Sequence, residues 1–289
     1  NFILAVSNVI APGRSSVIQN EISRGIYSGL TGEKAKAAYA MVIGICAELS
    51  FFVFNDKKLN KSNYLLILLY FLATMLTSKR MLCVIILLEI GVALKLFDFK
   101  GKSVKIILGG AIALVAVFVI TITIPQTSNI VDRFMEASED TSAGGRLMFW
   151  NYCIEMFKDK PIIGYGINTF NKAFSDNVGY VYQGSRWNMY AHSMYYELLG
   201  ETGIVGIVLF GFFMLYSLVY SLRLFRNSCL SNVWKGLLWF SISLQILFIV
   251  YGYSGNVLYD KAQLFTYLSS ISMLIAVSYH AFNEKEILI

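Results

Sequence analysis

The chain has 289 residues, of which 56% are hydrophobic, 15% aromatic and 15% charged, and its mean hydropathy is +0.60. Soluble domains carry about 25% charged residues, so this composition excludes an ordinary water-soluble protein. The net charge of +6 does not indicate nucleic-acid binding, because the basic residues form short clusters between apolar runs, a pattern that sets membrane topology.

The amino end begins abruptly with apolar residues. Asn1 is not an initiator methionine, and residues 2–10 run into turn-forming sequence without the basic segment or cleavage site of a signal peptide. We therefore expect residues 2–10 to end a helix whose beginning is missing. The chain would then be the carboxyl part of a longer polytopic protein.

Several segments are apolar enough to cross a membrane, which requires about 20 mostly apolar residues per helix. Spans are predicted at 37–54, 63–78, 80–97, 104–125, 202–222, 235–252 and 262–280. The second and third are nearly joined, which predicts a helical hairpin. The expected fold is an all-α polytopic membrane protein with about seven transmembrane helices and a long external helical loop.

Lysines and arginines in short loops orient such a chain, because cytoplasmic loops are enriched in them. Three basic stretches, 55–62, 95–105 and 223–235, fall on one side of a seven-span arrangement, which we expect to be cytoplasmic. The outward segments are then 11–36, 79–80, 126–201 and 253–261. Three regions are expected: membrane helices with the external loop 11–36 (1–125), an external helical loop (126–201), and membrane helices with a short cytoplasmic tail (202–289).

The long outward loop is expected to contain helices of its own. Apolar residues recur at helical spacing over 129–138 and 146–157. Lys158-Asp159-Lys160-Pro161 ends the second helix, and Gly164-Tyr165-Gly166 predicts a turn. Residues 167–174 predict a short amphipathic helix lying on the membrane.

The same loop is rich in amphipathic aromatic residues. They are Tyr180, Tyr182, Trp187, Tyr190, Tyr195 and Tyr196. Such rings are typical of the headgroup level of a bilayer, and we interpret them mainly as an interface belt. Stacking of one of them on a sugar is the alternative.

Two arginines stand at expected helix starts, where the positive end of the helix dipole disfavours a cation. Arg80 opens a span, and Arg146 follows two glycines. An anion shared between the free backbone N–H groups and the guanidinium would remove this penalty, so the pattern predicts a phosphate or diphosphate site. The alternative is that each arginine reaches lipid headgroups. Arg24, in the outward loop 11–36, either joins the site or is solvated.

His192 lies at the entry to the helix that continues into the span 202–222. A neutral imidazole is the best general base for a hydroxyl near neutral pH, although an interfacial histidine can also be a plain surface residue. His280, the second histidine, has no such surroundings and is interpreted as structural. Glu197 and Glu201, four residues apart, can orient His192, bind a substrate hydroxyl or be solvated caps.

Other candidates and motifs narrow the chemistry. Glu48 and Glu89 lie within expected spans, where an ionisable residue is a functional hypothesis by default. The four cysteines show no paired spacing, so neither a disulfide framework nor a zinc site is expected. The sequence contains no D-x-D pair in the outer loop, no P-loop motif and no hydrolase motif. We expect no metal and no cofactor.

One ordered series of residues runs through the second half of the chain. It comprises Gly145-Arg146, Trp150, Met156, Pro161, Gly164-Tyr165-Gly166, Phe170, Ala191-His192-Ser193, Glu197, Glu201, Gly203 and Gly206. The series resembles the domain shared by bacterial O-antigen ligases and Wzy-type polysaccharide polymerases, over roughly residues 20–255. Ser193 replaces the asparagine of the usual A-H-N motif, and Thr77-Ser78-Lys79-Arg80 is similar to the family's Ser-Arg entry to a span, with Lys79 inserted.

The resemblance implies a GT-C-like fold and a metal-independent, inverting glycosyl transfer. The donor would be a glycan on undecaprenyl diphosphate, and the acceptor a sugar hydroxyl. The diphosphate would be bound by three arginines, Arg24, Arg80 and Arg146. His192 would deprotonate or position the acceptor, with Glu197 and Glu201 in support.

We therefore expect an envelope glycosyltransferase of the bacterial cytoplasmic (inner) membrane, with its large loop facing outward, in lipopolysaccharide or capsule biosynthesis. A repeat-unit polymerase is favoured, and an O-antigen ligase acting on lipid A-core is the alternative. A lipid-linked glycan flippase is the main hypothesis of another class, but the polar residues crowd the outer surface and not mid-membrane helix breaks. An accessory subunit is the third. Expected partners are the lipid-linked donor, a glycan or lipid-linked acceptor, the bilayer and other polysaccharide assembly proteins.

Overall fold

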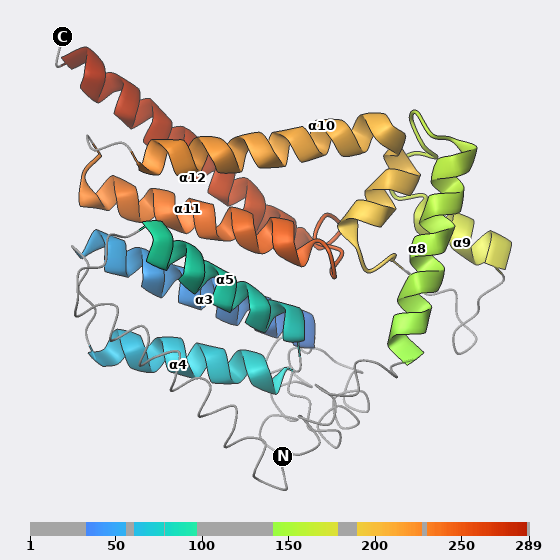
Figure 1. Cartoon of the computed structure of the whole chain (residues 1–289), viewed down its shortest axis with the longest axis horizontal. Coiled ribbons are helices and arrows are strands. Elements are labelled where there is room, and N and C mark those ends of the chain that lie inside the picture. The colour runs from blue at the N-terminus through green and yellow to red at the C-terminus, as the bar shows by residue number, and fades with distance from the viewer. Residues whose placement is uncertain are drawn as a thin grey trace, which may run out of the picture. The chain divides into compact units, whose positions relative to one another are not determined.

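The computed structural model describes residues 33–55, 61–77, 79–96, 141–178, 190–226 and 230–287. Eight helices and no strand occur within these residues. In chain order the helices are α3 (Lys34–Phe54), α4 (Lys61–Leu76), α5 (Arg80–Leu96), α8 (Thr141–Asp159), α9 (Phe170–Val178), α10 (Met194–Phe225), α11 (Asn232–Tyr251) and α12 (Lys261–Ile287) (Figure 1).

The expected all-α polytopic membrane fold is confirmed. In the described part of the chain, α3, α10, α11 and α12 are long and apolar enough to cross a membrane, and α4 and α5 contain shorter apolar helices. Six of the seven expected spans thus correspond to helices. The span expected at 104–125 and the helix expected at 129–138 lie outside the described residues.

The chain divides into two compact units. The first comprises Asn1–Ser138 and Ser231–Ser243, and the second comprises Glu139–Leu230 and Leu244–Ile289. Both units include part of α11.

In the first unit, close helix contacts depend on small residues and on polar pairs. A Cβ at Gly44 of α3 would lie 2.9 Å from the ring of Tyr70 on α4, so the glycine permits this approach. Ser50 Oγ donates to the carbonyl of Gly236 at 2.6 Å, which joins α3 to α11. Asn63 Nδ2 donates to Glu48 Oε2 at 2.6 Å. Glu48 therefore has a partner on the neighbouring helix, which the sequence pattern alone could not identify.

Glu89 of α5 is a fully buried acid of the first unit. Its polar neighbours are the Cys46 thiol of α3 and the Ser243 hydroxyl of α11, both also fully buried. An acid in such surroundings is costly to bury, and it stays a functional hypothesis within the first unit.

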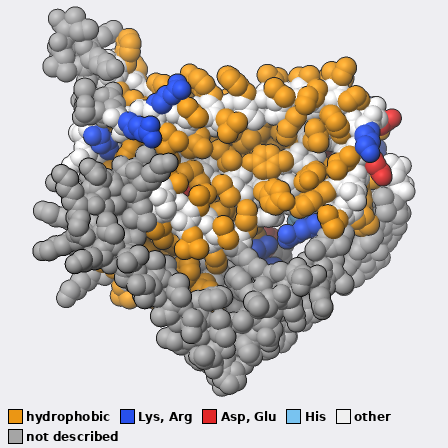
Figure 2. Space-filling view, viewed as in Figure 1, with side chains coloured by type: hydrophobic (Ala, Val, Ile, Leu, Met, Phe, Trp, Pro, Cys, Tyr) orange, Lys and Arg blue, Asp and Glu red, His pale blue; other side chains and the backbone are white. Residues whose placement is uncertain are grey.

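In the second unit, α10 has 32 residues and bends at Gly203, whose φ is 61° and ψ is −161° (Figure 1). At 1.5 Å per residue the whole helix would be about 48 Å long, well beyond the roughly 30 Å hydrocarbon core. The expected span 202–222 corresponds to the part after the bend. Exposed apolar side chains occur along that part, among them Leu209 and Phe212. Hydrophobic side chains also cover much of the described surface in Figure 2.

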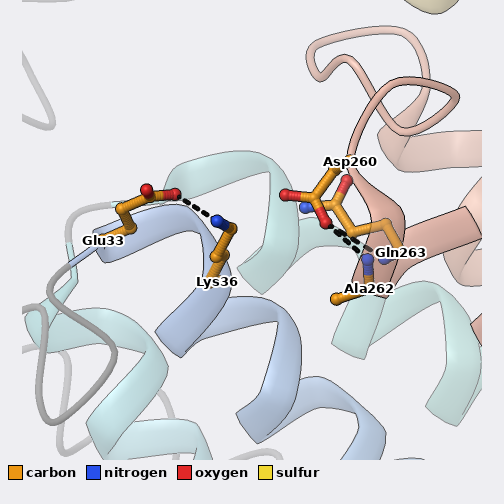
Figure 3. A network of polar contacts seen from close by, with 5 residues as sticks. All are labelled: Glu33, Lys36, Asp260, Ala262 and Gln263. Carbon is orange, nitrogen blue, oxygen red and sulfur yellow. Dashed lines mark hydrogen bonds and ion pairs between the residues drawn. The ribbon is translucent and has the colours of Figure 1, made fainter. Parts of the chain in front are cut away.

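Two helix starts show local polar contacts (Figure 3). Asp260 Oδ1 accepts the backbone N–H groups of Ala262 at 3.0 Å and Gln263 at 3.1 Å, the geometry of an N-cap at the start of α12. At the start of α3, Lys36 Nζ lies 3.0 Å from Glu33 Oε2. Asp260 fixes the end of the short connection from α11 to α12, which contributes to the site described next.

Candidate functional site

Helices α8 and α9 share a small hydrophobic core with the residue before His192. Its buried members are Phe149, Cys153, Met156, Phe170, Phe174 and Ala191. The three from α8 recur at intervals of four and three residues and therefore lie on one face of the helix. Phe149 packs edge-on against Phe174 with ring centroids 5.0 Å apart. The helix expected at 167–174 is α9, which begins three residues later.

The turn after α8 is bonded to the bend in α10. The backbone N–H groups of Ile204 and Val205 donate to the carbonyls of Pro161 at 2.9 Å and Ile162 at 3.2 Å. In the other direction, Gly166 N–H donates to the Glu201 carbonyl at 2.7 Å. Because a bend removes bonds within a helix, these contacts satisfy backbone groups that would otherwise be unpaired.

The predicted turn at Gly164-Tyr165-Gly166 is confirmed, and it needs its glycines. Gly164 and Gly166 have φ values of +65° and +107°, a region that residues with a Cβ rarely adopt. The expected end of the preceding helix is also confirmed, because α8 ends at Asp159.

Glu201 is fully buried and organises the second unit. Its two carboxylate oxygens accept the N–H groups of Asn168 at 2.8 Å and Phe170 at 2.9 Å, at the start of α9. Oε2 also accepts a hydrogen bond from the Tyr259 hydroxyl. Burial raises the pKa of Tyr259, and this bond raises it further. The interpretation of Glu201 as a solvated cap is therefore wrong. The Glu201 side chain links α9, α10 and the connection before α12.

Glu197 is 2% exposed and holds the backbone beside His192. Its Oε2 accepts the N–H of Ala191 at 3.0 Å, and Trp150 Nε1 donates to the Ala191 carbonyl at 2.9 Å. After His192, the N–H of Met194 donates to the carbonyls of Gly252 and Gly255 at 2.8 and 3.2 Å. The contacts favour Glu197 as a residue that orients His192 and exclude a solvated cap.

His192 is exposed and has a left-handed backbone conformation, with φ of 54°. Residues other than glycine adopt this region rarely, and such strain clusters at functional sites. The imidazole ring lies 6.1 Å from the Phe149 ring. His192 thus combines a fixed backbone with an accessible side chain, which suits a residue that must meet a substrate.

Arg146 lies three residues before Phe149 on α8, so it shares a face of the helix with that ring. Its positive charge also interacts electrostatically with the hydroxyl of Tyr251, at the end of α11. The structure therefore brings His192 close to the amino-terminal half of α8, about one helical turn from Arg146. The expected position of Arg146 at a helix start is wrong, because α8 begins at Thr141. Its case as an anion ligand depends on its charge and its neighbours.

The other two arginines are placed less fully. The α5 helix begins at Arg80, which confirms the expected helix start, but the Arg80 side chain lies outside what the structure describes. Arg24 also lies outside the described residues. Neither is positioned relative to His192.

Sequence reasoning missed the contribution of the connection 252–260. It supplies the carbonyls that bind Met194, the hydroxyl that binds Glu201, and Tyr253, whose ring lies 5.7 Å from that of Trp150. Its high content of glycine and tyrosine was the available signal. Among the described residues, no group of three or more His, Cys, Asp or Glu side chains can hold a metal ion.

Cys153 provides a test of the packing between α8 and α10. It is fully buried, and a Cβ on Gly200 of α10 would lie 3.0 Å from its carbonyl oxygen. Burial raises the pKa of the Cys153 thiol, and the carboxylates of Glu197 and Glu201 raise it further. Since the thiolate is the reactive form, N-ethylmaleimide at pH 8 should not modify Cys153 until the protein is denatured. Peptide mass spectrometry would measure this, and modification of the native protein would contradict the packing.

The chain matches a known protein family. A family model described as O-antigen ligase (Wzy_C) matches residues 65–211, just over half of the chain. The matched range contains Arg80, Arg146, His192, Glu197 and Glu201, whereas the connection 252–260 lies outside it. No curated protein matches the chain.

Proposed function

The chain belongs to the O-antigen ligase family, and we propose that it transfers a glycan from undecaprenyl diphosphate to a sugar hydroxyl. The family indicates an envelope enzyme that ligates or polymerises glycans. The observation that carries the proposal is that His192 lies beside Phe149 of α8, about one helical turn from Arg146, while Glu197 and Trp150 fix the backbone next to the histidine.

The proposed reaction is a direct displacement at the anomeric carbon. The imidazole of His192 accepts the proton of the acceptor hydroxyl, and the acceptor oxygen attacks the anomeric carbon as its bond to the diphosphate oxygen breaks. The electron pair leaves with the diphosphate, whose growing negative charge Arg146 stabilises, together with Arg80 and Arg24. The single displacement inverts the anomeric centre, and the imidazolium later returns its proton to solvent.

The proposed acceptor is a second lipid-linked glycan, which makes the enzyme a repeat-unit polymerase for surface polysaccharide. Transfer to lipid A-core, the ligase reaction, would use the same groups, because Arg146 and His192 act on the leaving group and on the acceptor proton. In both cases segment 126–201 faces the outer side of the cytoplasmic membrane, where lipid-linked glycans are used.

The experiment uses the purified chain in liposomes with a lipid-linked oligosaccharide repeat. A polymerase consumes the donor and produces a ladder of longer glycans on the carrier lipid. A ligase consumes the donor only when lipid A-core is added. A flippase moves the donor across the bilayer but leaves it intact, and an intact donor in every reaction would end the proposal of an enzyme.

A further inference from the structure

Two aromatic rings beside the proposed reaction centre have the character of a sugar-binding surface. Trp150 of α8 is partly buried, and Tyr253 is 51% exposed. Their ring centroids are 5.7 Å apart and the planes meet at 56°, so the two rings form an open wedge and not a closed stack. The wedge leaves aromatic surface accessible for a flat ligand.

The Trp150 ring is held firmly in place. Tyr196 stacks on it with centroids 4.7 Å apart and planes at 10°. The indole N–H is already used, because it donates to the Ala191 carbonyl. Trp150 therefore has no indole hydrogen bond left to offer, and what remains for a ligand is apolar ring surface.

The charged groups around the wedge indicate which ligand fits it. Trp150 lies four residues after Arg146, which is about one helical turn, or about 6 Å along α8. Tyr253 lies two residues after Tyr251, whose hydroxyl interacts electrostatically with Arg146. Trp150 also contacts the residue next to His192. The aromatic surface thus lies between an anion site and a base. In a lipid-linked donor the sugar is attached directly to the diphosphate, so a diphosphate near Arg146 would place the sugar next to this surface.

We propose that Trp150 and Tyr253 bind the first sugar of the lipid-linked donor by stacking on the apolar C–H face of its ring. This rests on the proposed function and adds the position of the donor sugar. Aromatic side chains suit such a ligand, because the rings cover apolar surface while the sugar hydroxyls at the edge stay hydrated.

A different aromatic cluster shows what an ordinary membrane-facing set looks like. Phe212, Tyr216 and Tyr220 stack along α10 at intervals of four residues, with centroids 5.9 and 6.1 Å apart. They lie on the apolar surface of the part of α10 after the bend, and Tyr216 is 59% exposed. Tyr216 is therefore a matched control for Tyr253: an exposed tyrosine on the same chain without the neighbouring Arg146 and His192.

The test measures binding of the full chain in detergent to four lipids by native mass spectrometry. They are undecaprenyl diphosphate alone and undecaprenyl diphosphate carrying glucose, galactose or N-acetylglucosamine. Wild-type protein should bind at least one glycosylated lipid more tightly than the bare lipid. Tyr253→Ala should reduce the ratio of the two affinities about three- to tenfold, the size expected for one aromatic contact. It should leave binding of the bare lipid unchanged.

The variants separate the outcomes. Tyr253→Phe should retain the preference, because stacking does not need the hydroxyl, and Tyr216→Ala should behave as wild type. Arg146→Ala should weaken binding of all four lipids. A sugar preference that survives Tyr253→Ala, or no preference for any of the sugars, overturns the stacking proposal. Failure of the wild type to bind any of these lipids instead overturns the proposed function.

Discussion

His192→Asn is expected to lower glycosyl transfer by about 10²–10⁴-fold, the range for loss of a general base. Asparagine is the sharper substitution, because it tolerates the left-handed backbone conformation that His192 adopts at φ 54°. The fold should therefore be kept while the imidazole is lost. The measurement is the initial rate of donor consumption in liposomes, together with donor binding, which should stay near the wild-type value.

Arg146→Ala is the companion variant, and it should fail in a different way. Loss of the guanidinium should weaken donor binding as well as turnover, since the charge is proposed to contact the diphosphate before and during bond cleavage. Lys158→Ala provides the control: Lys158 is an exposed cation on the same helix, in its last turn. A His192→Asn variant with wild-type turnover would show that the histidine is not the base. That result would favour the hypothesis that the protein is an accessory subunit.

The fold was predictable where one physical signal dominates. Long apolar runs specify spans, and for this reason α3 and α11 lie within three residues of the expected segments, and α12 begins one residue before its expected start, although it continues seven residues further. The turn at Gly164-Tyr165-Gly166 was predictable for a similar reason, because glycine is the residue that adopts positive φ without strain.

The start of α8 was not predictable in this way. Gly144-Gly145 reads as a helix break, since each glycine costs roughly 1 kcal/mol in a helix, yet α8 runs through both glycines from Thr141. The rest of α8 packs its apolar face on α9 and Ala191, and such packing contributes more to helix stability than local propensity.

The roles of the buried acids were also not predictable from the sequence. From spacing alone Glu201 could be a cap, a substrate ligand or a support for His192. Its role depends on Asn168 and Phe170, more than thirty residues earlier in the chain, and on Tyr259, 58 residues later. Sequence spacing identifies residues that share a helix face, but it does not show which distant donors meet a carboxylate. The same holds for Tyr253, which only the fold brings to Trp150.

The second large effect is expected from Gly203→Ala, at the bend of α10. The backbone of Gly203 has φ 61° and ψ −161°, a combination that is essentially confined to glycine. A Cβ there would also lie 2.5 Å from the Ile162 carbonyl oxygen and 2.7 Å from that of Pro161. Both carbonyls accept hydrogen bonds from the residues that follow the bend. Strain of about 1–3 kcal/mol and the displaced carbonyls should together destabilise the second unit by roughly 3 kcal/mol or more.

The matched control is Gly211→Ala, on the same helix eight residues further along. A Cβ at Gly211 meets nothing within 4 Å, so this variant should be neutral or raise stability by up to about 1 kcal/mol through helix propensity. The measurement is the thermal unfolding midpoint of both variants in one detergent, together with N-ethylmaleimide labelling of Cys153 below that midpoint. Gly203→Ala should lower the midpoint and expose Cys153, because straightening α10 pulls it from the turn after α8. Equal midpoints for the two variants would contradict the bend and, with it, the arrangement in which Glu201 binds the start of α9 and Glu197 binds the backbone next to His192.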